Sequence, residues 1–301
     1  MSSSPKLIIN ADDLGFSPQV NVAILRGAEL ETITAASVMV NMPFAESALH
    51  QIQERVPQLS LALHFTLTSG RPVSPLQEVP FLVDANGMFR LGFVSLWRTL
   101  ASKQRTALLA QIQIELSAQM NRMDQLAENY QICFDHLDSH QHIHVLPGIW
   151  ELLQQEAEQR RLPLRVPRER WGNLKRWSCR SWTWFPGGLL KQMILNGCLW
   201  NIPQQIGYFG ILETGRMDKP ALLAIFQSIR ESRFFDIYEI NTHPSVLTEA
   251  DEQGKLCCSE ADKQFHTSSW REREFQTLNG DDVLQWSKQY GITLSGFSGT
   301  G

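Results

Sequence analysis

Short apolar runs alternate along this chain with longer segments in which apolar residues recur every three or four positions. Uninterrupted short runs indicate buried strands, and the longer period indicates amphipathic helices. The pattern predicts strands at 7–9, 35–40, 59–63, 132–137, 235–240 and 292–294. It predicts helices beginning at Ser17-Pro18 and at 44–55, 107–129, 147–161, 219–232, 260–276 and 281–290. Alternating strands and helices, with no internal repeat or low-complexity linker, indicate a single α/β domain over residues 1–301.

Polar residues directly follow four of the predicted strands. Asp12 and Asp13 follow the first, His64 ends the third, a histidine-rich stretch follows the fourth, and His243 follows the strand at 235–240. Because the carboxyl ends of strands share one rim in α/β folds, we expect these groups to meet there. Neighbouring residues on a strand point to opposite faces, so Asp12 and Asp13 are expected to have different roles. The alternatives are turn or helix-cap acids and a satisfied core histidine.

The histidine-rich stretch, residues 135–144, holds four of the chain's eight histidines and two aspartates. In an extended backbone alternate side chains share a face. This would bring to one face His136, Asp138, His140, His142 and His144. Imidazole and carboxylate are the ligands that Zn²⁺ and similar divalent ions take in proteins. We therefore expect a metal-dependent active site here rather than a histidine-rich surface loop.

Two segments depart from the regular pattern. Residues 66–92 carry scattered glycine and proline, which predicts a long loop over the rim with a short hairpin around Asn86-Gly87. Residues 160–180 carry eight arginines and lysines against one acid, Glu169, and open a tryptophan-rich basic insertion around 168–205. Such a segment could rest on an anionic membrane or hold an amphiphilic substrate. A solvated face beside an aromatic cluster explains it equally well.

Composition narrows the class of protein further. A net charge of −4 argues against general nucleic-acid binding. The five cysteines are odd in number and form no CxxC pair, so a disulfide scaffold and a thiolate zinc site are not expected. The start of the chain lacks a signal-peptide pattern, and no apolar run approaches the roughly 18 residues of a membrane span. We expect a cytoplasmic enzyme, with peripheral membrane contact only if the tryptophan-rich segment provides it.

Four motifs together resemble those of the YdjC-like (ChbG-like) carbohydrate deacetylases, which are related to the NodB-type polysaccharide deacetylases. In the family's order they are NADDLG at 10–15, LH at 63–64, HLDSHQHIH at 136–144 and NTHP at 241–244. The sequence LRVPRE at 164–169 and the tryptophan-rich segment after it resemble the hopanoid-biosynthesis-associated branch of that family. The resemblance runs from about residue 6 to residue 297.

The resemblance implies a fold, a reaction and a set of roles. The fold would be a distorted (β/α) barrel of the NodB/YdjC deacetylase type. One divalent metal ion (Zn, Mg, Mn or Co) would be held by Asp13, His64 and His140, with Asp12 as general base and His243 as general acid or orienting group. The reaction would remove an N-acetyl group from an amino sugar, releasing acetate. In the hopanoid branch the substrate would be an N-acetylglucosaminyl hopanoid, and a homodimer is expected on resemblance alone.

Amide hydrolysis explains why such residues would gather. The reaction needs an activated water, a stabilised oxyanion and a proton for the departing amine. Asp138 would orient a liganding imidazole. Arg165 would either pair with Asp12 and tune its pKa or cap a strand. His142 or His144 would line the pocket, or one of them would replace His140 as a ligand.

Two other functions fit parts of the pattern. A metal-dependent phosphoesterase also uses clustered histidine and aspartate, although few bridging carboxylates and no glycine-rich phosphate loop are present. A non-catalytic sugar- or lipid-binding protein would keep the pocket without the chemistry. Turnover of an acetamido sugar separates the deacetylase from both.

Overall fold

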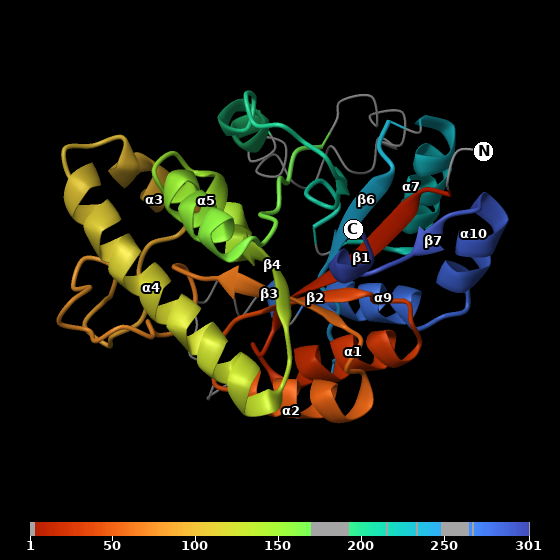
Figure 1. The fold of residues 1–301 in the computed structure, drawn as a ribbon, viewed down its shortest axis with the longest axis horizontal. Coiled ribbons are helices and arrows are strands. Elements are labelled where there is room, and N and C mark those ends of the chain that lie inside the picture. Colours follow the sequence, from red (N-terminus) through yellow and green to blue (C-terminus); the bar gives the residue numbers. More distant parts are fainter. Residues whose placement is uncertain are drawn as a thin grey trace.

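The strands form one parallel sheet in the computed structural model, which describes residues 4–169, 193–214, 216–232, 234–247, 265–266 and 268–300. Their order across the sheet is β4-β3-β2-β1-β6-β5, and the short β7 pairs with the beginning of β1. They are β1 (Lys6–Leu14), β2 (Ala35–Val38), β3 (Ser60–Phe65), β4 (Phe134–Ser139), β5 (Gly207–Phe209), β6 (Ile237–Thr242) and β7 (Thr293–Leu294). The sheet curls into a half-barrel (Figure 1). The expected distorted (β/α) barrel class is confirmed.

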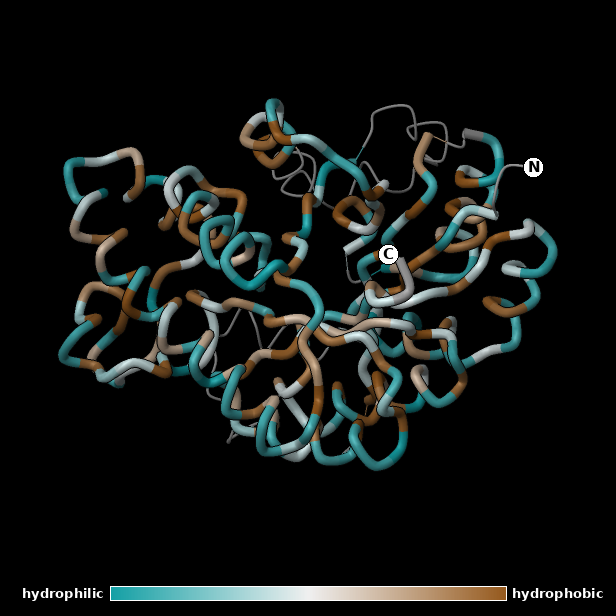
Figure 2. The backbone as a smooth tube through the Cα atoms, viewed as in Figure 1, coloured by the Kyte–Doolittle hydropathy of each residue, from teal (hydrophilic) through white to brown (hydrophobic). Residues whose placement is uncertain are grey.

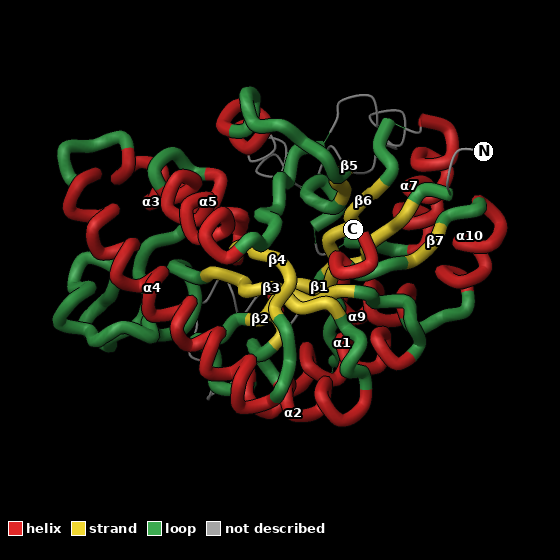
Figure 3. The backbone as a smooth tube through the Cα atoms, in the orientation of Figure 1, coloured by secondary structure: helices red, strands yellow, loops and turns green. Residues whose placement is uncertain are grey.

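The helices cover the outer face of this sheet. They are α1 (Pro18–Glu29), α2 (Ala45–Arg55), α3 (Phe93–Leu100), α4 (Arg105–Tyr130), α5 (Ile149–Arg160), α7 (Lys219–Ser232), α9 (Ser269–Leu278) and α10 (Asp282–Tyr290). Around the outside, α5, α4, α2, α1, α9, α10 and α7 contact one another in that order. Figure 3 shows these helices surrounding the central strands. The helices therefore lie around the outside of the sheet in the same order as the strands that precede them in the chain.

The two faces of the curled sheet differ in polarity. On β1, Leu7, Ile9 and Ala11 face the helices and belong to the main hydrophobic core. The alternate residues include Asn10 and Asp12, which are buried although they are polar. Figure 2 shows apolar residues concentrated on the central strands and on the inward sides of the helices. The interior of the half-barrel is therefore polar toward the carboxyl ends of the strands.

Local sequence signals explain how the chain passes from β1 into α1. Ser17 caps α1 as predicted, because its Oγ accepts a hydrogen bond from Val20 N at 3.2 Å. The chain turns from β1 into this cap through Gly15, whose φ is +95°. A Cβ on Gly15 would lie 2.8 Å from Ala45 Cα, so only glycine fits between β1 and α2.

Most predicted elements are present, with three differences. The sequence pattern missed α3 and the three-residue β5, and the range predicted as one helix, 260–276, is interrupted: residues 265–266 are helical, and α9 begins separately at Ser269. The hairpin around Asn86-Gly87 is confirmed by the antiparallel bridge between Val83 and Phe89. Most of the tryptophan-rich insertion, residues 170–192, lies outside the described residues. Its described end buries Leu195 and Leu199 in a small apolar cluster.

Candidate active site

The carboxyl ends of β1, β3, β4 and β6 bring the predicted polar groups together. Side chains that face the interior of the half-barrel there include Asp12 on β1, His64 on β3 and Asp138 on β4. Parallel register places His64 beside Asp138 and Ala11 beside Thr242, the residue before His243. Residues far apart in the sequence therefore reach one small volume.

The backbone between Asp12 and Asp13 departs from regular strand geometry. Asp13 has φ of +71°, and the register between β1 and β2 shifts between Ala11 and Leu14. The expectation that the two carboxylates point to opposite faces is therefore wrong. His64 Nε2 lies 3.8 Å from Asp12 Oδ2 and 3.6 Å from Asp13 Oδ1. A left-handed residue inside a strand turns both acids toward the same histidine.

Asp13, His64 and His140 form a buried group that could hold a metal ion. One potential ligand atom from each lies within 4.8 Å of the others. Asp13 Oδ1 is also 2.9 Å from His140 Nδ1. A second group of the same kind consists of Asp12, His64 and Asp138, so His64 is common to both.

The chemistry of this donor set fits a divalent cation. Asp138 Oδ1 lies 2.7 Å from His64 Nδ1, so the carboxylate orients the ring and holds its proton on that nitrogen. The opposite nitrogen, His64 Nε2, is buried and has no hydrogen-bond partner among the described residues. In an imidazole held in this way a cation would take the place of the Nε2 proton on the side of Asp13, which is the arrangement expected of a metal-ligating histidine.

Electrostatics in the group keep Asp13 ionised. Burial raises the pKa of Asp13, but the neighbouring His140 and His64 outweigh burial and hold the pKa well below its ordinary range. Burial lowers the pKa of His64, but Asp138 and Asp12 raise it to about 10. The carboxylates therefore concentrate negative potential on this histidine, as they would on a bound cation.

Both oxygens of Asp12 contact Arg165, and one of them also faces two histidines. Its Oδ1 accepts hydrogen bonds from Asn10 Nδ2 at 2.8 Å and from Arg165 Nη1 at 3.1 Å. Its Oδ2 accepts a longer hydrogen bond from Arg165 Nη1 at 3.3 Å and lies 3.8 Å from both His64 Nε2 and His243 Nε2. The oxygen that could accept a proton therefore faces the space between two histidines.

Arg165 joins three carboxylates inside the half-barrel. Its Nη1 lies 3.1 Å from Asp12 Oδ1 and 2.6 Å from Asp138 Oδ2, and its Nε lies 2.7 Å from Glu239 Oε1. Burial lowers the pKa of Arg165, but Asp12, Asp138 and Glu239 raise it well above its ordinary value. The guanidinium is therefore a fixed positive charge beside Asp12, and the expected pairing of Arg165 with Asp12 is present.

His243 follows β6 and faces Asp12. Burial lowers its pKa to about 4, although the nearby Asp12 and Asp13 raise it. The imidazole is therefore neutral at neutral pH. Its backbone N–H donates a hydrogen bond to Glu274 Oε2 at 2.5 Å, which fixes the start of the segment after β6.

The rest of the histidine-rich stretch does not continue as a strand. β4 ends at Ser139, and Gln141 and His142 have φ of +56° and +57° in a 3₁₀ turn from His140 to Val145. The expected shared face of five side chains is therefore wrong. His142 lies edge-on to Tyr208, with ring centroids 6.1 Å apart.

His144 and His136 also lie away from the metal group. His144 lies between Ser139 Oγ at 2.5 Å and the carbonyl oxygen of Arg165 at 3.0 Å. His136 stacks on Phe297. Within the described part of the chain, the groups that could hold a metal include His140 but neither His142 nor His144.

Several neighbours of the site were not predicted. Arg271 on α9 reaches Asp13 Oδ2 with its Nη1 at 3.1 Å, and His266 Nε2 lies 3.9 Å from the same oxygen. The interior acid Glu239 and the small polar residue Ser37, which donates to Asp138 Oδ2 at 2.6 Å, complete the network. Glu239 carried a usable signal, because it is an acid inside an apolar run with the same parity as Asn241.

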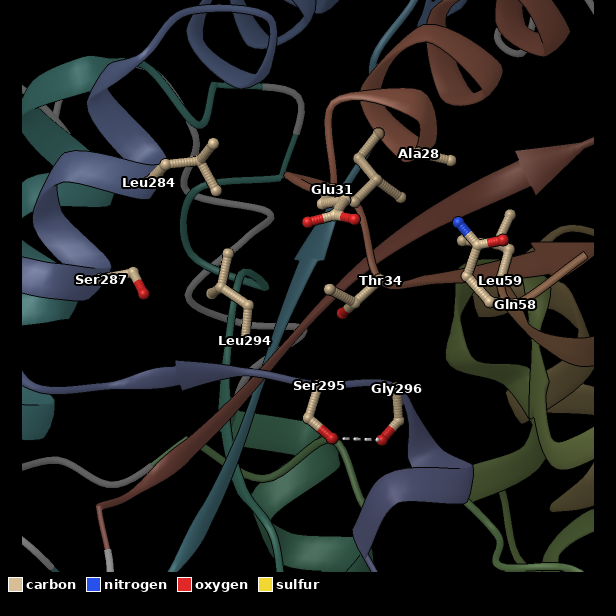
Figure 4. Close-up of a pocket in the computed structure, with 11 residues that line it drawn as sticks. Ala28, Glu31, Thr34, Gln58, Leu59, Leu284, Ser287, Leu294, Ser295 and Gly296 are labelled. Atoms are coloured by element: carbon tan, nitrogen blue, oxygen red, sulfur yellow. Dashed lines mark hydrogen bonds between the residues drawn. The ribbon is translucent and has the colours of Figure 1, made fainter. Parts of the chain in front are cut away.

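A separate cavity of about 280 Å³ lies at the other end of the sheet. Its lining includes Thr34 and Leu59, which precede β2 and β3, and Leu294 to Gly296. Figure 4 shows the side chains of Glu31, Leu284 and Leu294 around it. No residue of the candidate active site lines this cavity.

Comparison with known proteins identifies the family to which the chain belongs. The family model described as YdjC-like protein matches residues 6–289 of the chain. The chain belongs to the YdjC-like family. Residues 6–289 include β1 with both aspartates, the metal group, His243 and α9, so the YdjC-like match covers the whole candidate site.

Curated relatives of this YdjC-like chain carry deacetylase names. A carbohydrate deacetylase of Geobacillus stearothermophilus is 38% identical over 162 residues, which are 54% of this chain and 59% of the relative. A chitooligosaccharide deacetylase of Proteus mirabilis is 35% identical over the same shares of the two chains. The matches therefore span about three fifths of the length of these relatives. A carbohydrate deacetylase of Thermoanaerobacter pseudethanolicus is 28% identical over 97% of this chain and 98% of its own.

A solved structure has the same fold. The crystal structure of an Enterococcus faecalis V583 protein, provisionally assigned to cellobiose-phosphate cleavage, superposes with a TM-score of 0.72. It covers 99% of each chain at 20% identity, so the likeness concerns the fold alone. Among the described residues, no helix is long and apolar enough to cross a membrane.

Proposed function

We propose that this chain is a metal-dependent carbohydrate deacetylase that hydrolyses the N-acetyl group of an amino sugar and releases acetate. The observation that carries the proposal is the convergence of Asp12 and Asp13 on His64, with His140 completing a buried ligand group. The deacetylase names of relatives across the family support the same reaction.

Asp13, His64 and His140 would hold the cation. One carboxylate and two imidazoles suit Zn²⁺, Mn²⁺, Co²⁺ or Mg²⁺ and leave positions open for other ligands. When bound, a divalent cation lowers the pKa of a water molecule and polarises a carbonyl oxygen. The chain's own residues account for the remaining proton movements.

Asp12 is proposed as the general base. Arg165 and Asn10 hold the carboxylate so that it cannot rotate freely, and Oδ2, which accepts the longer bond from Arg165 at 3.3 Å, would take the proton of the attacking water. The fixed positive charge of Arg165 also compensates the negative charge of Asp12 before the proton arrives. Asp138 would position His64 and would not itself contact the substrate.

His243 is proposed to act on the leaving nitrogen from the other side of Asp12. Because its pKa is about 4 in this arrangement, the ring is neutral when the reaction begins. Negative charge that develops during amide hydrolysis would raise the pKa of the ring. His243 would then accept from Asp12 the proton that the attacking water gave up and pass it to the departing amine, or it would orient the amide while neutral.

For the substrate we propose an N-acetylglucosaminyl hopanoid, on the branch resemblance of residues 164–169 and the tryptophan-rich segment. Trp182 and Trp184 lie outside the described residues, so this choice rests on sequence. The double substitution Trp182→Ala with Trp184→Ala should raise KM for a lipid-linked substrate or weaken binding to anionic liposomes. Wild-type behaviour in both assays would remove membrane or hopanoid contact from the proposal.

Acetate release from the purified protein tests the proposed function. The metal-reconstituted protein is offered the N-acetylglucosaminyl hopanoid, diacetylchitobiose and free N-acetylglucosamine, with chelator-treated protein as control. Release from the hopanoid alone supports the reaction and the lipid substrate. Release from the soluble sugars keeps the deacetylase and removes the lipid. No release from any substrate, with metal bound, contradicts the proposal, and turnover of a nitrophenyl phosphate would then favour a phosphoesterase.

A further inference from the structure

Helix α9 places two charged side chains completely inside the molecule. Arg271 and Glu274 lie one helical turn apart on α9, and each has 0% exposed surface. A buried charge is costly unless other groups compensate it. Their contacts lead to two residues of the candidate active site, Asp13 and His243, which come from the first strand and from the end of β6.

The two oxygens of the Asp13 carboxylate contact different groups, and Arg271 contacts one of them. Its Nη1 lies 3.1 Å from Asp13 Oδ2 and 2.6 Å from His266 Nδ1. The other oxygen, Asp13 Oδ1, faces His140 Nδ1 at 2.9 Å and His64 Nε2 at 3.6 Å. One oxygen is therefore anchored to α9 while the other is presented to the two histidines.

The same contacts restrain the backbone of Asp13. A non-glycine residue with φ of +71° persists only where its surroundings hold it. Besides the Arg271 contact, Phe16, three residues further on, stacks on His266 with ring centroids 3.3 Å apart. The segment around α9 therefore holds both the side chain and the chain direction at Asp13.

Glu274 holds the backbone at His243. Its Oε2 accepts the N–H of His243 at 2.5 Å, and its Oε1 accepts the N–H of Met217 at 2.8 Å. Two further bonds attach the segment after β6 to α9. The Arg271 carbonyl accepts Ser245 N–H at 3.2 Å, and Glu272 Oε2 accepts Leu247 N–H at 2.7 Å.

We propose that Arg271 and Glu274 are positioning residues of this site. Arg271 sets the rotation of the Asp13 carboxylate so that Oδ1 faces the cation position, and Glu274 sets the distance of His243 from Asp12. Both act through another residue and neither contacts a reacting atom. The inference rests on the proposed function for the reaction and on the contacts of α9 for the positioning.

The sign of the change in metal affinity separates positioning from simple charge balance. A positive charge 3.1 Å from a ligand carboxylate repels a cation, so removing it would tighten metal binding if Arg271 only balanced charge. If Arg271 instead holds the carboxylate in place, its removal weakens binding, because groups that orient a ligand typically contribute about 10- to 100-fold in affinity. We expect weakening.

Arg271 is tested by metal titration of the full chain without any substrate. Zn²⁺ or Mn²⁺ is titrated into Arg271→Gln, the wild type and the control Arg273→Gln, an exposed position on the same helix. We expect about 10-fold or weaker binding in Arg271→Gln and wild-type binding in the control. Unchanged or tighter binding would overturn the inference. If Arg271→Gln does not fold, Arg271→Lys keeps the charge without the guanidinium geometry and should also weaken binding.

Glu274 is tested by Glu274→Gln at pH 8.5. Burial raises the pKa of Glu274 to about 7, while the accepted N–H bonds and Arg271 lower it, so the wild-type side chain is ionised at this pH. An amide can accept only one of the two N–H bonds. We expect faster amide hydrogen exchange over 241–247 and a roughly 10-fold lower kcat, with wild-type metal affinity and KM. Wild-type exchange and kcat would overturn the role.

These readouts separate the inference from the proposed function. If the wild type releases no acetate but Arg271→Gln weakens metal binding and Glu274→Gln loosens residues 241–247, the deacetylase proposal fails and the positioning roles stand. If the wild type releases acetate and both variants match it in metal affinity, exchange and kcat, the deacetylase proposal stands and the positioning roles fail.

Discussion

Asp138 Oδ1 lies 2.7 Å from His64 Nδ1, across two strands whose register places these residues side by side. Asp138 also contacts Arg165, so one carboxylate links a candidate metal ligand to the charge beside Asp12. The substitution Asp138→Asn should therefore weaken metal binding by about 10- to 100-fold. Calorimetric titration with Zn²⁺ measures the change.

Asp135→Asn on the same strand is the control for Asp138→Asn. Asp135 contacts Ser60 and His136 and lies outside the candidate metal groups. It should alter stability while leaving metal affinity near the wild-type value. Equal affinity in the two variants would contradict the role of Asp138.

Asp12→Asn should abolish most of the turnover while metal stays bound. An asparagine still accepts a hydrogen bond from Arg165 but cannot take a proton from water, and a general base contributes about 10²- to 10⁴-fold to the rate. The expected result is a loss of at least about 100-fold in kcat with metal affinity changed only a few-fold. Turnover near the wild-type level would exclude Asp12 as the base.

The buried His144 should make the stability of the fold sensitive to acid. Burial lowers its pKa to about 4 from 6.5, against the raising effects of Asp138 and the Arg165 carbonyl. Because the folded state binds fewer protons than the unfolded state between these values, His144 supports stability fully above pH 6.5, and this support is lost as the pH falls toward 4. The free energy of unfolding should change by on the order of 2–3 kcal/mol across that window.

Urea unfolding of His144→Gln measures this dependence. The variant should lose stability less steeply than the wild type between pH 6.5 and 4.5, while His243, whose pKa is also about 4, leaves part of the slope in place. Parallel slopes in the His144 variant and the wild type would show that another group carries the pH dependence.

Gly15→Ala should destabilise the protein by about 1–3 kcal/mol, because a Cβ would lie 2.8 Å from Ala45 Cα. The φ of +95° adds strain for any residue with a side chain. Gly92→Ala is the matched control, since φ is −87° and no atom lies within 4 Å of its added Cβ. Its effect should stay below about 1 kcal/mol. Similar unfolding midpoints for both variants would contradict the packing argument.

Hydrophobic periodicity predicted the fold well because each strand has one face packed on helices. Helix α7 covers the 219–232 range predicted for it, and α10 begins one residue after the predicted start. The pattern failed for β5, whose three residues are too few to show a period. The pattern also gave no indication of the role of Glu115 and Gln119. These two polar residues lie within the buried stripe of α4 and bind the loop after β3.

The site was predictable where its residues follow strands and unpredictable where the backbone leaves regular geometry. Asp12, Asp13 and His64 stand at strand ends, so their meeting follows from parallel topology. The left-handed conformation of Asp13 has no such signal, because here it is held by contacts with residues far away in the sequence. Arg271 supplies one of these contacts from the other end of the chain, in a polar helix whose sequence resembles a solvated one.

The contact between Asp13 and Arg271 spans 258 positions of sequence. At roughly 5–20 residues per second of ribosomal synthesis, Arg271 is synthesised about 13–52 s after Asp13. Until α9 emerges, the first strand carries an acid whose side chain and backbone lack the restraint that Arg271 supplies. The candidate cation position would therefore be completed late in synthesis, and a chain that stops before α9 should lack a finished site even where its earlier strands have paired.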